Sequence, residues 1–343
     1  MTGRATIRMT ASALGLLHGA VLLAGFLAPY HFSEQHRDYP YVPPAGIHFI
    51  DAAGRFHLRP FVYGLNPDAR SGGYREDTAR VYPVRFFVRI GSGEESGVIP
   101  FRWRLFRVPE PGVLFLLGSD GFGRDVFSRL MYGGQVSLLT GLMAAFLSLG
   151  LGLVIGTAAG FWGGWLDQLL MRGAELVMAL PWLYLLLAVR AFLPLHISTV
   201  QAFFLLIGII GGVGWVRPAR LIRGVVLSAK ERGFVLAARG FGAGDLYLIR
   251  RHVIPQTFPV VLTQATVLIP QYILAEVTLS FLGLGVGEPV PSWGNMLAEA
   301  RQYHALVAHG WMLAPGLAAI PVLLGYIILA DTLAERTGAA SQA

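Results

Sequence analysis

The chain has 343 residues, of which 54% are hydrophobic and 14% are charged, and its mean hydropathy is +0.57. Soluble domains carry about 25% charged residues, so this composition predicts a membrane protein. The absence of cysteine excludes disulfides, thiolate metal ligands and a cysteine nucleophile. The formal net charge of +7 would suggest nucleic acid as a partner of a soluble protein. In a membrane protein the distribution of basic residues matters more, because it sets orientation.

The N-terminal segment 1–28 is predicted to be a transmembrane helix. Arg4 and Arg8 precede an apolar run of about 18 residues, which is long enough to cross the hydrocarbon core. A cleaved signal peptide is the alternative. The run is long for a signal peptide, and its end, GFLAP, lacks the small-x-small cleavage pattern, so we expect the helix to be retained.

The segment 29–132 has a different character, with charges, prolines and aromatics mixed together. The stretches VYPVRFFVRI and IPFRWRLFRV alternate between apolar and polar residues, which predicts β-strands with one solvated face. Aromatic residues interleaved with basic ones can also bind nucleic acid. We favour solvated strand faces, and therefore expect a partly β insert after the first helix and no nucleic-acid partner.

The rest of the chain returns to an apolar pattern that predicts five more membrane spans. With the N-terminal helix this makes six spans. The loop between the fourth and fifth spans, residues 217–255, carries eight basic residues and only two acidic ones, Glu231 and Asp245. Short basic loops stay in the cytoplasm, so both termini and the tail 336–343 are predicted inside, and residues 29–132 outside. The five predicted spans are about 135–160, 174–193, 199–216, 256–282 and 309–331.

The basic loop contains signals for a short helix. Ser228 and Glu231 fit the S-x-x-E pattern of a capping box, in which each side chain satisfies an amide at the helix start. We therefore expect a helix from Ser228 to about Arg239. Gly240 and Gly242 are expected to end this helix with a left-handed cap.

A second short helix, LYLIRRH, is predicted to follow, with Asp245 as its N-cap and its end before Pro255. Ala237 and Ala238 would leave one face of the first helix nearly flat, so that another protein could approach closely. The two helices favour a docking site outside the membrane. An ordinary surface loop is the alternative.

The stretch ERGFVLAARGFGAGDLYLIRRHVIPQ resembles the EAA loop of permease subunits in binding-protein-dependent ABC importers. Ala237, Ala238, Gly242 and the terminal Ile254–Pro255 match that motif, whereas Leu236 stands where the family usually has Glu. Two further stretches, residues 117–141 and 273–297, resemble motifs of the C-type subunits of dipeptide and oligopeptide importers. The first reads GSDGFGRDVFSR in its centre, with Ser119 in place of Thr.

The resemblance covers about residues 117–335 and implies an all-α polytopic membrane protein with six helices, the type I ABC importer transmembrane fold. Residues 133–335 would form the permease domain. The implied partners are a second permease subunit of the B type, two ATPase subunits, an extracytoplasmic solute-binding protein and the lipid bilayer of the cytoplasmic (inner) membrane. The hairpin 228–255 would couple to the ATPases.

The sequence has no G-x-x-x-x-G-K-[ST] loop, so we expect no enzyme activity and no cofactor in this chain, with ATP and Mg bound by the partner subunits. Peptides are the expected cargo, and nickel chelates are an alternative. A secondary transporter is the rival class, but it would usually show two repeated halves and more spans.

Candidate residues for the translocation path are Gln264, Gln271 and Glu276, because polar groups inside a membrane are costly. Glu276 could instead lie near the outer interface or pair with a partner subunit. Charged residues of the GSDGFGRDVFSR motif are expected to form an ion-pair and capping network that orients the second helix, or else to contact the binding protein. These residues are Asp120, Arg124, Asp125 and Arg129, and the motif residues Gly123, Trp293 and Gly294 are also expected to be structural. No metal site is predicted.

Overall fold

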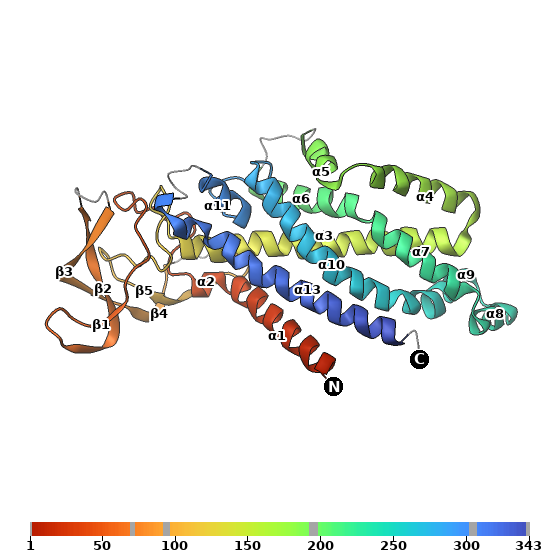
Figure 1. Cartoon of the computed structure of the whole chain (residues 1–343), viewed down its shortest axis with the longest axis horizontal. Coiled ribbons are helices and arrows are strands. Elements are labelled where there is room, and N and C mark those ends of the chain that lie inside the picture. The colour runs from red at the N-terminus through yellow and green to blue at the C-terminus, as the bar shows by residue number, and fades with distance from the viewer. Residues whose placement is uncertain (1, 69–72, 92–96, 192–197, 302–306, 341–343) are drawn as a thin grey trace. The chain divides into compact units, whose positions relative to one another are not determined.

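The structure is a computed structural model that describes residues 2–68, 73–91, 97–191, 198–301 and 307–340 (Figure 1). The chain divides into two compact units. Unit 1 comprises Met1–Leu14, Leu139–Leu279 and Val322–Ala343, and unit 2 comprises Gly15–Leu138 and Ser280–Pro321. Four long helices contribute residues to both units.

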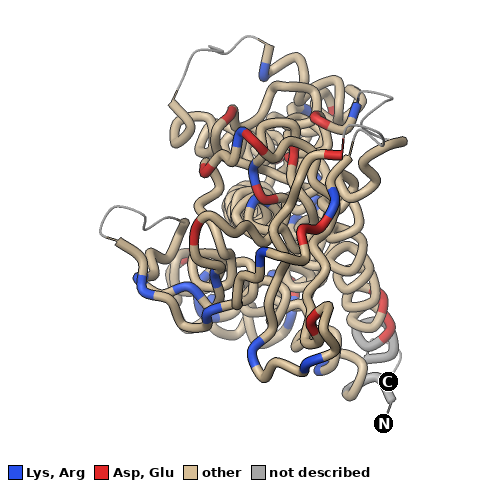
Figure 2. Tube along the Cα trace, turned by 90° about the vertical axis from the view of Figure 1, so that its left-hand side faces the viewer, with Lys and Arg blue, Asp and Glu red and all other residues tan. Residues whose placement is uncertain are grey.

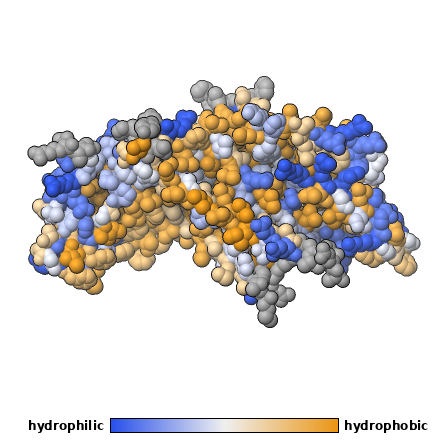
Figure 3. Space-filling model, in the orientation of Figure 1, coloured by the Kyte–Doolittle hydropathy of each residue, from blue (hydrophilic) through white to orange (hydrophobic). Residues whose placement is uncertain are grey.

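Most of the described chain is helical. The helices are α1 (Thr2–Leu22), α2 (Ala24–Leu27), α3 (Val126–Trp162), α4 (Gly164–Ala179), α5 (Trp182–Ala191), α6 (Thr199–Gly214), α7 (Val216–Lys230), α8 (Gly233–Gly240), α9 (Asp245–Leu248), α10 (Ile254–Phe281), α11 (Trp293–Glu299) and α13 (Ala314–Ala340). A π-helical turn, η1 (Ile249–Val253), joins α9 to α10, and a 3₁₀ turn, η2 (Gly310–Leu313), precedes α13. In Figure 3, hydrophobic residues cover the middle of the unit 1 helices on the visible face, and hydrophilic residues gather near α7 and α9.

Four described helical stretches are long and apolar enough to cross a membrane: Ala5–Leu22, Val126–Trp162, Asp245–Phe281 and Gly310–Glu335. Two bent pairs pass the same test when each is taken as one span, which gives up to six. The pair α4 and α5 is bent by 93°, and the pair α6 and α7 by 43°. The helical membrane character is as predicted, and the count of six stays a prediction.

Two predicted boundaries are wrong. The expected single span 174–193 is broken at Leu180, because Pro181 disfavours helical geometry in the residue before it and Leu180 is extended (φ −89°, ψ 138°). The second long helix begins at Val126, well before the predicted residue 135, whereas the end of the insert at residue 132 stays a prediction. The last residues of the GSDGFGRDVFSR motif therefore lie in the first turn of α3.

In unit 1, a row of glycines on α3 lets α7 approach closely. A Cβ atom on Gly152 would lie 2.6 Å from Cβ of Pro218, and one on Gly156 would lie 2.5 Å from the carbonyl oxygen of Ala219. Glycines spaced four residues apart on an apolar helix allow such backbone-to-backbone packing. α7, which leads to the basic hairpin, is therefore held against α3.

Unit 2 contains the strands. β1 (His48–Ile50), β2 (Phe56–Asp68) and β3 (Gly73–Pro83) form an antiparallel sheet in that order. β4 (Arg85–Arg89) and β5 (Trp103–Arg107) form a separate antiparallel pair, in which Phe86 lies opposite Phe106. Both alternating stretches contain strands, as predicted. β1 and β2 were not predicted.

Candidate functional site

The basic hairpin starts differently from the prediction. α7 continues to Lys230, so Ser228 lies in its last turn, and Glu231 is its C-cap. The prediction of a capping box at Ser228 is wrong. The apolar face of α7 stays buried through Val226 and Ala229, so the helix continues beyond Ser228. The next helix, α8, begins after Arg232, which forms no side-chain capping bond.

The turn after α8 is closed by one left-handed glycine. Gly242 has φ +86°, and its amide donates to the carbonyl of Arg239 at 3.0 Å. The amide of Ala243 donates to the carbonyl of Ala238 at 3.1 Å, which completes a Schellman motif. The left-handed cap was predicted for both glycines. Gly240 is the last residue of α8 and is not left-handed, so that part is wrong.

The segment after the turn is also longer than predicted. The prediction of Asp245 as N-cap is wrong: Gly244 is the N-cap of α9, since its backbone is extended (φ −71°, ψ 156°), and Asp245 is the first helical residue. A carboxylate oxygen of Asp245 lies 3.6 Å from Nη2 of Arg239. The predicted end before Pro255 is wrong, since α9, η1 and α10 continue as one helical stretch, Asp245–Phe281. Pro255 lacks an amide donor, and the wide π turn just before it accommodates the missing bond.

The inner side of the hairpin packs on unit 1. An ion pair joins Arg223 on α7 to Asp167 on α4, with N–O distances of 2.5 and 2.6 Å. The guanidinium of Arg239 lies 5.5 Å from the ring centre of Phe161 at the end of α3. Apolar packing completes the attachment. The buried cluster is Phe161, Ile222, Val226, Ala229, Val235, Leu248, Ile249 and Val253, with Ala238 and Ala243 packed against it.

The outer side of the hairpin is apolar and exposed, and we call it the hairpin tip. Phe241 is 94% exposed and lies between two glycines at the turn. Ala237 is exposed, whereas Ala238 faces the buried cluster, so the two alanines do not form one flat face as predicted. The larger exposed side chains of the hairpin were not predicted, although a phenylalanine between two glycines is a visible signal of an exposed turn. The hairpin tip is Phe234, Leu236, Phe241, Leu246 and Tyr247.

Unit 1 also holds a cavity of about 520 Å³. Trp182 of α5 and Tyr272 of α10 stack on its wall, with ring centres 5.8 Å apart, and Arg217 and Gln271 add polar groups. Of the three predicted path residues, Gln271 lines this cavity, whereas Gln264 is half-buried and outside the lining. Glu276 is fully buried and also outside it. Five residues correspond to about 140° around a helix, so Gln271 and Glu276 point in different directions.

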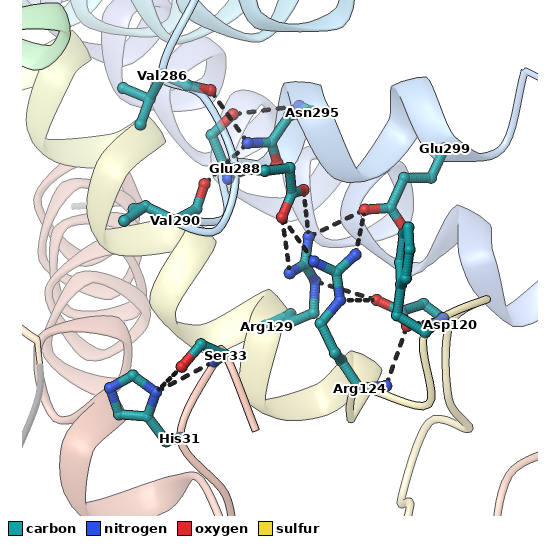
Figure 4. A network of polar contacts seen from close by, with 12 residues as sticks. His31, Ser33, Asp120, Arg124, Arg129, Val286, Glu288, Val290, Asn295 and Glu299 are labelled. Carbon is teal, nitrogen blue, oxygen red and sulfur yellow. Dashed lines mark hydrogen bonds and ion pairs between the residues drawn. The ribbon is translucent and has the colours of Figure 1, made fainter. Parts of the chain in front are cut away.

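In unit 2, a cluster of charged side chains gathers around Arg124 and Arg129 (Figure 4). Nε of Arg124 donates to Oδ2 of Asp120 at 2.6 Å. Its two terminal nitrogens donate to Glu288 at 2.6 Å and to Glu299 at 2.8 Å. Arg129 donates to the same two glutamates at 2.8 and 3.0 Å. The ion pairs near Asp120 were predicted. Glu288 and Glu299 were missed, because no sequence spacing links them to the motif.

The cluster contains three carboxylates and two guanidinium groups. The pKa of Glu299 is raised to about 7, because burial and the neighbouring Asp120 and Glu288 carboxylates, which raise it, outweigh Arg129 and Arg124, which lower it. Burial also acts to raise the pKa of Glu288, but Arg129 and Arg124 outweigh it and the net pKa is lowered. The cluster is therefore electrically neutral when Glu299 holds a proton and negative when it does not.

The remaining motif residues fix the start of α3 and of α11. Oδ2 of Asp125 accepts hydrogen bonds from the amide and hydroxyl of Ser128, as an N-cap does, while burial raises the Asp125 pKa to about 7. Gly123 has φ +71°, and a Cβ there would collide with the carbonyl of His36. Nε1 of Trp293 donates to the carbonyl of Leu130, and Gly294 is buried beside it.

These long apolar helices define a helical membrane protein. Residues 152–338 match the family described as binding-protein-dependent transport system inner membrane component, and the chain belongs to this family. It is thus a permease subunit of an ABC importer, embedded in the membrane.

Named relatives share more than a third of their aligned residues with the chain. A Brucella ovis protein whose name includes "peptide permease protein" is 40% identical over 220 residues, covering 64% of this chain and 70% of that protein. The dipeptide transport system permease protein DppC of Bacillus subtilis is 37% identical over 196 residues, covering 57% and 59%. The inward-facing MetNI methionine ABC transporter aligns with 60% of this chain and 97% of its own, at 17% identity and a TM-score of 0.44.

Proposed function

We propose that this permease imports peptides, and that it forms half of a translocation path with a second permease subunit. The names of the relatives, a peptide permease protein and a dipeptide permease, support peptides over nickel chelates. The six-span topology, with both termini in the cytoplasm and the β insert outside, is part of the proposal. The eight basic residues of the loop 217–255 support it.

The hairpin tip is the proposed docking site for an ATPase subunit that binds ATP and Mg. The observation that carries this assignment is the 94% exposure of Phe241, on a turn whose inner side is firmly packed. Exposed aromatic residues on a rigid base are the side chains that dominate protein–protein interfaces. The basic flanks keep this surface on the cytoplasmic side, where ATP is available.

The inner side of the hairpin supplies a route for transmitting ATPase movement. The Arg223–Asp167 ion pair connects α7 to α4, and the glycine row connects α7 to α3. A push on the hairpin would therefore move α3, α4 and α7 together, as rocking of packed helices requires. The cavity lined by Gln271, Arg217 and Trp182 is the proposed part of the path in this subunit.

Association with the ATPase subunits tests the docking assignment. Replacing Phe241 by Asp should cost about 2 kcal/mol or more in binding, which is about thirtyfold in affinity. Phe241→Tyr keeps the ring and serves as the matched control. Co-purification of ATPase with the Asp variant at the wild-type level would refute the assignment.

Single-cysteine labelling tests the topology, because the natural chain has no cysteine. A cysteine at the exposed strand position Thr78 should react with an impermeant reagent from outside the cell, and one at Phe241 should react from the cytoplasm. The reverse pattern would overturn the proposed orientation.

A further inference from the structure

The β4–β5 pair of unit 2 carries an exposed aromatic and basic surface, here called the interfacial patch. Phe87 is 62% exposed, and Trp103 on the neighbouring strand is 49% exposed. Arg85 and Arg89 are also exposed, and the regular β4–β5 register places them on the same face of the pair as Phe87 and Trp103. A small domain that needed only solubility would not place two large aromatic side chains together at its surface.

The patch is joined to the end of the first membrane helix. The ring centre of Phe26 lies 6.3 Å from that of Phe87 and 6.0 Å from that of Phe101. Phe26 belongs to α2, which packs against β5. Phe87 has φ +52°, a backbone conformation that bulky residues rarely adopt.

The position of Phe26 fixes the depth of the patch. α1 has 21 residues and is therefore about 32 Å long, close to the thickness of the hydrocarbon core. Phe26 follows the end of α1 by four residues, where a chain enters the headgroup region. The rings that contact Phe26 must lie near the same level of the membrane.

The charges of the patch suit lipid headgroups. β4 and β5 together contain four arginines and no carboxylate. Figure 2, in which the left-hand side of Figure 1 with its strands faces the viewer, marks Lys and Arg positions in blue. Arg104 is buried and donates to the carbonyl of Pro29, and Arg107 pairs with Glu34. Arg85 and Arg89 remain at the surface beside the aromatics, the combination found at membrane interfaces that contain anionic lipid.

We infer that the interfacial patch rests on the bilayer, with Phe87 and Trp103 among the headgroups and Arg85 and Arg89 on the phosphates of anionic lipids. The β insert would then be held against the membrane beside α1. This inference rests on α1 crossing the membrane, and it is independent of the cargo and of the docking site.

Fluorescence quenching by lipid tests the inference directly. Phe87→Cys and Trp103→Cys would each be labelled with an environment-sensitive fluorophore in the full-length chain, purified with its accompanying subunits and reconstituted into vesicles. The vesicles contain phosphatidylcholine with or without phosphatidylglycerol, and a lipid that carries a nitroxide near its headgroup. Thr78→Cys on β3, also exposed, is the matched control.

Both patch positions should lose most of their fluorescence to the nitroxide lipid, whereas the Thr78 position should keep most of it. Adding Arg85→Gln and Arg89→Gln should remove the extra quenching that phosphatidylglycerol provides. Probes that a water-soluble quencher reaches freely would overturn the inference. Probes shielded from both quenchers would overturn it as well, since a protein partner would then cover the patch. An error in the proposed topology would be detected separately, by the cysteine labelling at Thr78 and Phe241.

Discussion

Replacing Gly156 by Ala should separate α7 from α3 and thereby weaken the base of the hairpin. The added Cβ would lie 2.5 Å from the carbonyl oxygen of Ala219 and 3.1 Å from its Cα. Both atoms belong to the backbone, so no side-chain rotation relieves the overlap. The two helices must move apart along the glycine row.

The size of the effect can be worked out by comparison with Gly150→Ala on the same helix. No described atom outside the helix lies within 4 Å of a Cβ at Gly150. Both substitutions should raise the free energy of unfolding by up to about 1 kcal/mol, because alanine has a higher helix propensity than glycine. Overpacking costs about 1–3 kcal/mol, and only Gly156→Ala incurs it. The difference between the two variants therefore isolates the clash.

Thermal unfolding of the two variants in the same detergent measures this difference. Gly156→Ala should unfold at a temperature several degrees below that of Gly150→Ala, corresponding to about 1–3 kcal/mol. Gly150→Ala should unfold at or slightly above the wild-type temperature. Equal unfolding temperatures would show that α3 and α7 do not approach as closely as described, and the proposed transmission route would lose its basis.

Three further predictions concern the charge cluster, the ion pair and the hairpin turn. Because the folded-state pKa of Glu299 is raised to about 7, its contribution to stability is full below about pH 4.5 and is lost as pH rises through 7. The melting temperature should fall over that window, and Glu299→Gln should reduce the fall; an unchanged slope would contradict the assignment. Arg223→Gln and Asp167→Asn should each destabilise the protein, and a double-mutant cycle should give a coupling of about 1 kcal/mol, with additive effects as the opposing result. Gly242→Ala should lower the free energy of local opening of α8 by about 1 kcal/mol and so speed its amide hydrogen exchange, because Gly242 has a left-handed φ. Gly240 does not, so Gly240→Ala should leave the exchange rate of α8 unchanged; equal rates in the two variants would refute the cap.

Features set by local chemistry were predictable from the sequence. The alternating stretches predicted β4 and β5, and the glycine at position 242 predicted a left-handed helix end. The capping box at Ser228 shows the limit of local reasoning. Its four residues fit the pattern, but the apolar face of α7 decided where the helix ends. Burial against a neighbouring helix outweighs a capping preference of about 1 kcal/mol.

Features that depend on distant parts of the chain were not predictable. Glu288 and Glu299 meet Arg124 across 164 and 175 residues of sequence, and no periodicity indicates such a pairing. The bend at Pro181 and the inward direction of Ala238 likewise depend on how the helices pack. The glycine row at 152 and 156 is a different case, because its four-residue spacing on an apolar helix was visible and was overlooked.

The central claim is that the hairpin tip couples ATP hydrolysis in the partner ATPase subunits to peptide movement through this permease. Uptake of a labelled dipeptide into vesicles that hold the assembled transporter, with its binding protein outside and ATP inside, tests it most directly. Wild-type and Phe241→Tyr transporters should accumulate peptide only when ATP is present, and Phe241→Asp should lose that uptake while the chain still inserts into the membrane. Full ATP-driven uptake by Phe241→Asp, or uptake by this chain alone with an ion gradient, would contradict the account.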